Sequence, residues 1–125
     1  MIQIGKIVYY LLSGDTTVAG YVGTKIYPLI IPENTTTPAI MYERRGDPDY
    51  NKDGAGLYKT YVYITIIGDN YSEIINITQA VADVLENYSG ILYSTSVRDI
   101  EIANIQETYY DDKYIEELTF LFTTN

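Results

Sequence analysis

The sequence has 125 residues, a formal net charge of −9, and neither cysteine nor histidine. A chain of this length is expected to form one domain over residues 1–125, with a core that needs no disulfide or metal. Without His and Cys it lacks the usual general base, zinc ligands and activated nucleophile, and its charge opposes binding to duplex DNA, so neither an enzyme nor a groove-binding protein is expected.

The N-terminal part of the chain predicts a helix, a short second piece and a brief extended segment. Apolar residues at helical intervals place an amphipathic helix over residues 3–12, and no signal-peptide cleavage site follows it. Residues 16–23 are expected to form a turn or helical piece with Val18 and Val22 facing inward. Pro28 and Pro32 confine the extended residues 25–28 to an edge or a loop.

The middle of the chain predicts two strands separated by a loop. Residues 39–45 read as the first strand, and residues 46–56 are rich in Gly, Pro and Asp, which is typical of a loop. The second strand, residues 57–67, has apolar side chains at both alternating sets of positions. Both of its faces are therefore expected to be covered, one of them by another subunit.

A second helix is expected between Asn70 and Gly90. Asn70 and Glu73 form a capping pair at its start, and Gly90 is predicted to be its C-terminal cap. One apolar stripe marks its inner face, formed by Ile74, Ile77, Thr78, Val81, Val84, Leu85 and Tyr88.

The C-terminal part predicts three strands. A short one covers residues 91–93, and residues 97–108 and 114–122 form a hairpin around residues 109–113. The apolar alternation slips by one position near Ala103 or Asn104, which indicates a β-bulge. The order of elements predicts an α+β fold, with a mainly antiparallel sheet and two helices packed on one face.

One motif partly matches a calcium loop. Asp49, Asn51, Asp53 and Gly54 fit the first half of an EF-hand loop, but Thr60 stands where a bidentate Glu is needed and the flanks read as strands. An exposed turn is the favoured interpretation, and no metal or other cofactor is expected.

Two pairs of carboxylates, Asp111–Asp112 and Glu116–Glu117, do not predict catalysis. The first pair lies in a hairpin turn, and neighbours in a strand point to opposite faces. By the same rule Arg44 and Arg45 point to opposite faces, one solvated and the other available to an acid across a subunit boundary.

Tyrosine is the unusual feature of the composition, with 15 Tyr against two Phe and no Trp. Tyr suits half-buried positions in sheets and is enriched at protein interfaces. Two interpretations therefore stand, half-buried sheet positions or contacts between subunits.

An ordered series of segments resembles the tail terminator family of siphophages, also described as tail completion or head–tail joining proteins. A short helix leads to a valine–glycine segment at 18–23 and to Ile26-Tyr27-Pro28. A Pro-led strand at 37–42, a Gly-Asp-Pro-Asp loop at 46–49, a helix after 69–73 and an acidic Tyr-Asp hairpin follow in order.

This resemblance implies a virion structural protein without catalytic residues. Members form a ring, usually of six subunits, that caps the tail tube and joins it to the head connector. The implied partners are copies of the same chain, the tail tube protein and the connector proteins, with DNA only passing through the lumen and no membrane. The implied location is the virion tail, reached from the host cytoplasm during assembly.

Two alternatives remain open from the residues alone. One is another phage head–tail adaptor or minor tail protein, and the other is a small carboxylate- or calcium-dependent binding domain. For the leading interpretation, the residues expected at a subunit or tube interface are Asp47, Asp49, Tyr50, Asp53, Tyr61, Tyr63, Tyr109, Tyr110, Asp111 and Asp112.

Overall fold

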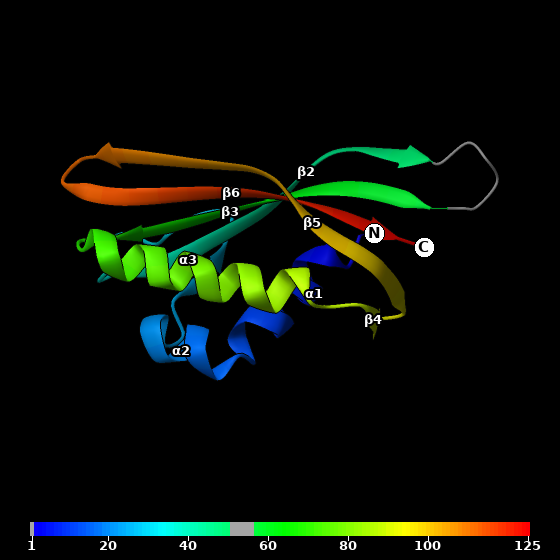
Figure 1. The fold of residues 1–125 in the computed structure, drawn as a ribbon, viewed down its shortest axis with the longest axis horizontal. Coiled ribbons are helices and arrows are strands. Elements are labelled where there is room, and N and C mark those ends of the chain that lie inside the picture. The colour runs from blue at the N-terminus through cyan, green and yellow to red at the C-terminus, as the bar shows by residue number, and fades with distance from the viewer. Residues whose placement is uncertain (1, 51–56) are drawn as a thin grey trace.

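The computed structural model describes residues 2–50 and 57–125, with residues 46–50 described by their backbone alone. Within these residues three helices lie on one side of a six-stranded sheet (Figure 1). The α+β fold predicted from the sequence is confirmed, and the expected helical piece at residues 16–23 adds a third helix to the two long ones.

Of the three helices, the second and the third begin at a side-chain cap, whereas the Gln3 side chain forms no capping hydrogen bond at the start of the first. Helix α1 spans Ile4–Ser13, α2 spans Thr16–Val22 and α3 spans Tyr71–Glu86. The Asp15 carboxylate accepts a hydrogen bond from the Val18 N–H at 3.0 Å, and the Asn70 side chain accepts one from the Glu73 N–H at 2.9 Å. These bonds satisfy backbone donors that the first helical turn leaves free.

The sheet has the order β1-β2-β3-β6-β5-β4. Its strands are β1 (Ile26–Pro28), β2 (Ala39–Tyr50), β3 (Tyr58–Gly68), β4 (Gly90–Leu92), β5 (Thr95–Tyr110) and β6 (Lys113–Thr124). Strand β1 pairs parallel with β2, and every other neighbouring pair is antiparallel. The predicted edge position of β1 is confirmed.

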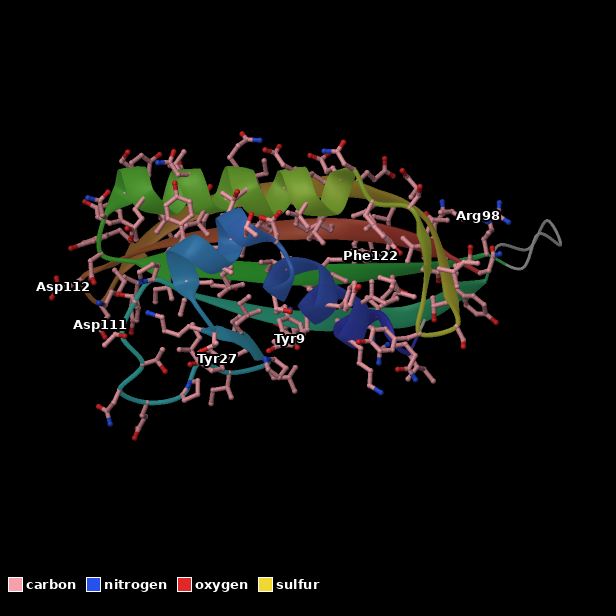
Figure 2. All side chains as sticks on the ribbon, turned by 90° about the horizontal axis from the view of Figure 1, so that it is seen from below. Tyr9, Tyr27, Arg98, Asp111, Asp112 and Phe122 are labelled. Carbon is pink, nitrogen blue, oxygen red and sulfur yellow. The ribbon has the colours of Figure 1, made fainter. Side chains whose placement is uncertain are left out.

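The core lies between the helices and one face of the sheet. The four long strands β2, β3, β6 and β5 send side chains into it, and the apolar stripes of α1 and α3 close it from the other side. Figure 2 shows Phe122 within this layer. The largest side chains with almost no exposure are Phe120, Phe122, Ile4, Ile7, Leu12, Ile40, Ile64, Ile66, Ile74, Ile77, Leu85 and Leu118.

The predicted end of the first long strand was wrong. Strand β2 does not end at residue 45 but continues to Tyr50, because β3 offers it partners as far as the Tyr50–Tyr58 pair. The pairing shifts register between Arg45 and Asp49, where a bulge accommodates the missing N–H of Pro48.

Gly90 is not the cap of α3. The helix ends at Glu86 and Asn87 is its C-cap, with the Asn87 amide donating a 2.8 Å hydrogen bond to the Asp83 carbonyl. Gly90 instead opens β4 with a φ of 154°, and a Cβ there would meet the Tyr88 hydroxyl at 2.9 Å. Glycine suits this position because side chains rarely adopt that φ.

The C-terminal hairpin is confirmed, but its turn is shorter than the predicted residues 109–113. Only Asp111 and Asp112 lie outside the strands, with φ of 52° and 61°, as a two-residue type I′ turn requires. The predicted bulge is confirmed, since the pairing of β5 with β6 shifts between Ile102 and Asn104. No helix in the described ranges is long and apolar enough to cross a membrane.

Candidate assembly surfaces

The side of the sheet opposite the helices has no covering layer within the described residues (Figure 1). We call its central part the open face. On β3 the even-numbered residues 60–66 are buried, whereas their odd-numbered neighbours are half-buried or exposed. Strand β6 alternates in the same way. The open face consists of Met41, Glu43, Arg45, Tyr61, Tyr63, Thr65, Ile67, Ile115, Glu117, Thr119 and Leu121.

Charged and aromatic groups meet on the open face. Arg45 Nη2 lies 2.9 Å from Glu43 Oε1, and its guanidinium lies 4.7 Å from the centre of the Tyr63 ring. The hydrogen bond and the charge of Glu43 raise the pKa of Arg45, with a smaller contribution from Glu117. The Arg45 side chain is 60% exposed, so this cluster is accessible to a partner.

Strands β2 and β5, the outer two of the four long strands, each have an edge that is largely free. Strand β4 covers β5 only at Thr95–Val97, and β1 covers β2 only at Ile40–Tyr42. Within the described part of the chain, residues 98–110 of β5 and residues 43–50 of β2 have no strand on their outer side. An unpaired edge presents a row of backbone donors and acceptors that another strand can use.

The β5–β6 hairpin projects beyond the helices at one end of the sheet (Figure 1). Tyr109 and Tyr110 are 60% and 72% exposed, and Asp111 and Asp112 lie at the turn, the end opposite Arg98 in Figure 2. The Tyr109 ring packs against Tyr114, with ring centres 4.9 Å apart. Tyr110 extends outward and offers a large aromatic surface.

A polar network anchors this hairpin close to its turn, through Lys113. Lys113 forms an ion pair with Asp69, which precedes α3, and its ammonium also donates to the Thr37 hydroxyl at 3.2 Å. Thr37 in turn donates to Asp69 at 2.7 Å. The hydrogen bonds from Lys113 and Thr37 hold the pKa of Asp69 below its usual value. Three segments distant in sequence are thereby joined.

Next to this network lies a pair of carboxyl groups that face each other across β5 and β6. Glu107 and Glu116 are cross-strand partners, and the Tyr71 hydroxyl donates to Glu107 Oε2 at 2.7 Å. Glu116 is only 3% exposed, and its Oε2 has no hydrogen-bond partner among the described residues. Burial and the adjacent Glu107 raise the pKa of Glu116 to about 7.

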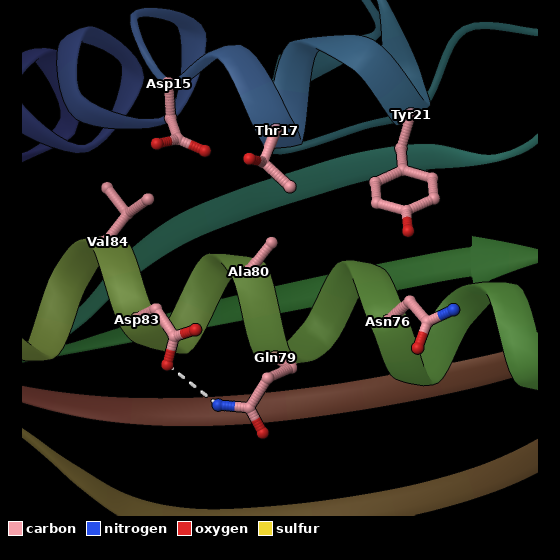
Figure 3. A pocket seen from close by; sticks show the side chains of 8 residues that line it. All are labelled: Asp15, Thr17, Tyr21, Asn76, Gln79, Ala80, Asp83 and Val84. Carbon is pink, nitrogen blue, oxygen red and sulfur yellow. Dashed lines mark hydrogen bonds between the residues drawn. The ribbon is translucent and has the colours of Figure 1, made fainter.

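On the helix side, an open groove of about 420 Å³ runs between α2 and α3 (Figure 3). Gln79 and Asp83 are joined by a 2.8 Å hydrogen bond on one wall, and the α2 cap Asp15 lies on the other. The lining residues are Asp15, Thr17, Tyr21, Asn76, Gln79, Ala80, Asp83 and Val84. These side chains include no cation, and Asp15 is already engaged with the backbone of α2.

Apart from Asp53, the residues predicted to lie at a subunit or tube interface fall in three separate parts of the sheet. Tyr61 and Tyr63 lie on the open face, and the residues 109–112 form the hairpin tip. Asp47, Asp49 and Tyr50 belong to the end of β2 at the opposite end of the sheet, and their side chains are outside the described part, as is all of Asp53.

The predictions about charged pairs agree with the structure where it describes them. Glu116 is buried under the helices and Glu117 is exposed on the open face, so neighbours in β6 do point to opposite sides. The calcium-like segment 49–54 lies outside the described side chains. In the rest of the chain no group of three or more Asp or Glu residues could hold a metal ion.

Three features were not predicted from the sequence. They are the carboxyl pair on β5 and β6, the Lys113 network and the free strand edges. The carboxyl pair could have been found by counting outward from a two-residue turn at Asp111–Asp112, which places position 107 opposite 116. Placing the turn over five residues concealed that register.

A similar arrangement occurs in a known particle. A chain from a solved structure described as the virion of a native gene transfer agent (GTA) particle has the same fold, with a TM-score of 0.77. The two chains are 18% identical, and the match covers 94% of this chain and 90% of the other. No curated protein sequence matches this chain significantly. The fold is thus one that a chain of a virion particle also has.

The sequence model of a family described as tail completion protein gp17 matches residues 6–124. The chain belongs to this family, and it is therefore a structural protein of a phage tail or head–tail junction. The resemblance noted from the ordered sequence segments is confirmed. As a tail completion protein, the chain associates with other components of a virion.

Proposed function

We propose that this protein is a tail terminator. Copies of the chain, usually six, form a ring at the head-proximal end of the tail tube. The ring stops polymerisation of the tube and provides the surface that meets the head connector. DNA passes through its lumen without being bound. The role is structural, with no catalytic step and no cofactor, and residues 1–125 act as one assembly domain in the virion tail after assembly in the host cytoplasm.

The observation that carries this proposal is the one-sided sheet in a member of a tail completion family. The helices cover one face, whereas the open face keeps Tyr61, Tyr63 and Leu121 at least partly accessible. Partly exposed apolar side chains beside unpaired strand edges are a kind of surface that proteins cover by assembly. A ring interface is permanent and should be larger and more apolar than a transient one.

The proposed contacts divide between the two ends of the sheet. Tyr109, Tyr110, Asp111 and Asp112 would contact the tube or a neighbouring subunit at the hairpin tip. The segment of β2 that contains Asp47, Asp49 and Tyr50, together with Asp53 beyond it, would do so at the other end. Tyr61 and Tyr63 would contribute from the open face between them.

The test is assembly on tail tubes. Purified protein is mixed with tail tubes, and its mass is measured by light scattering while tube ends are viewed by negative-stain electron microscopy. A discrete ring, or a monomer that assembles at one end of the tube and halts its growth, is expected. Protein that stays monomeric and leaves tube growth unchanged would contradict the proposal.

A further inference from the structure

The free edge of β5 has outward-pointing backbone groups at defined positions. In a two-residue hairpin the residues beside the turn exchange both of their hydrogen bonds, and the pattern then alternates along the strand. Tyr110 and Lys113 are that first pair. Following the register through the bulge, the N–H and C=O of Ile102, opposite Phe120, point away from β6.

The free edge of β2 can be oriented independently from its contacts with β1. The Ile40 N–H donates to the Lys25 carbonyl, and the Tyr42 carbonyl accepts from the Leu29 N–H, both at 2.9 Å. Ile40 and Tyr42 thus direct their backbone groups outward. By alternation Arg44 does the same, beyond the point where β1 ends.

One row of residues crosses the four long strands and reaches both free edges. Arg45 pairs with Tyr61, Tyr61 with Leu121 and Leu121 with Glu101, so all four lie on the open face. Arg45 stands at one free edge of this row and Glu101 at the other. Both side chains are exposed and opposite in charge.

We propose that the free edge of β5 around Ile102 pairs antiparallel with the free edge of β2 around Arg44 in a second copy of this chain. This inference rests on the proposed ring and identifies its subunit contact. Strand directions alternate from β2 to β5 across the sheet, so a second copy in the same orientation places its β2 antiparallel to β5. The sheet continues from one subunit to the next in a head-to-tail contact, the kind that closes into rings.

The register satisfies hydrogen bonding and charge together. Pairing Ile102 with Arg44 of the second copy joins two residues whose backbone groups both point outward. Glu101 then faces Arg45 of the second copy as a non-hydrogen-bonded pair, with Cβ atoms about 4.5–5.5 Å apart. The guanidinium of Arg45 has five N–H donors, so it can bond Glu101 while keeping Glu43.

Charge also disfavours the symmetric alternative, in which β5 pairs with β5 of another copy. The free edge of β5 carries Asp99, Glu101 and Glu107 against the single cation Arg98. Two such edges would bring like charges together, which is destabilising across strands. The paired arginines of β2 provide the complementary charge.

The test is disulfide cross-linking of introduced cysteines, which is selective because the natural sequence contains no cysteine. The double variant Arg45→Cys with Glu101→Cys is oxidised, both in isolation and bound to tail tubes, and run on a non-reducing gel. A ladder of covalent oligomers ending at the ring size is expected. The matched control is Arg44→Cys with Glu101→Cys, whose cysteines would lie on opposite faces and should give no ladder.

The remaining outcomes each overturn the pairing in a recognisable way. Rings that form without a 45–101 cross-link overturn this contact and leave the tail terminator function standing. A covalent dimer from the single variant Glu101→Cys indicates pairing of β5 with β5 and also overturns it. Protein that forms no oligomer, alone or on tubes, overturns both proposals.

A charge exchange provides a second readout that needs no cross-link. Glu101→Lys and Arg45→Glu should each cause loss of the ring, as measured by light scattering, and the two together should restore it. Glu86→Lys, which changes an exposed charge on α3, should leave the ring intact. A double variant that stays as defective as the single variants would overturn the proposed pair.

Discussion

At the scale of single residues, Val81 tests the packing of helix on sheet. Its side chain is fully buried on the inner face of α3, with the core residues of the sheet beside it. The change Val81→Asp places an unpaired charge there and should lower the free energy of unfolding by at least about 3 kcal/mol. Thermal unfolding followed by circular dichroism measures the effect. Asn76→Asp is the control, because Asn76 is exposed on the same helix. Equal stability of the two variants would mean that the inner face of α3 has been assigned wrongly.

The raised pKa of Glu116 predicts that the stability of the folded protein depends on pH. Burial and Glu107 raise its pKa in the folded state to about 7, above the ordinary value of 4.5. The folded protein therefore binds this proton more tightly than the unfolded chain, so the group's stabilising contribution is complete below pH 4.5 and is lost as the pH rises through about 7. The groups facing it are Glu107 on β5 and Tyr71 on α3, of which Tyr71 donates to Glu107.

The change Glu116→Gln keeps the shape of the side chain but removes its charge. The variant should be more stable than the natural protein by roughly 1–3 kcal/mol at about pH 8, and this difference should vanish near about pH 5. Urea unfolding at a series of pH values measures it. Glu117→Gln, on the exposed open face, should follow the natural protein throughout. If Glu116→Gln did so too, the carboxyl pair would have no influence on folding.

At the scale of elements, the β5–β6 turn allows a test of backbone geometry. Asp112 has a φ of 61°, a conformation that glycine adopts freely and a β-branched residue strongly resists. Asp112→Gly should therefore raise the free energy of unfolding by about 0.5–1 kcal/mol, and Asp112→Val should lower it by about 1–2 kcal/mol. Chemical denaturation of the two variants gives both values. Equal stabilities would contradict a type I′ turn at these residues.

The elements also show which parts of the fold the sequence could predict. The local signals at the start of α3 and along it were reliable, because the Asn70 cap and the apolar stripe depend only on residues a few positions apart, although the local signal for its end, Gly90, was wrong. Boundaries that depend on a distant partner were not reliably predicted. Strand β2 continues past residue 45 because β3 pairs with it, and no local feature of the Gly-Asp-Pro-Asp sequence predicts that. The free edges depend on the order of all six strands, so they appear only in the folded molecule.

At the scale of the whole molecule, charge governs how the protein meets DNA. The 17 acidic residues outnumber the eight basic ones, for a formal net charge of −9. Acidic side chains are exposed on β5, at the hairpin tip and on the open face, so the negative charge is distributed over the surfaces where assembly is proposed. A ring built from such subunits would present DNA with a repulsive lumen, along which a duplex can pass without being held.

The corresponding prediction is that the assembled protein does not bind duplex DNA. A labelled duplex mixed with the protein should show no retardation in a gel at an ionic strength of about 0.1 M, because no set of phosphates is neutralised and no counterions are released. Lowering the salt to about 0.01 M strengthens repulsion between like charges and should not induce binding. Retardation that weakens steeply as salt is added would instead reveal a cationic surface created by assembly, and DNA would then be a bound partner of the ring.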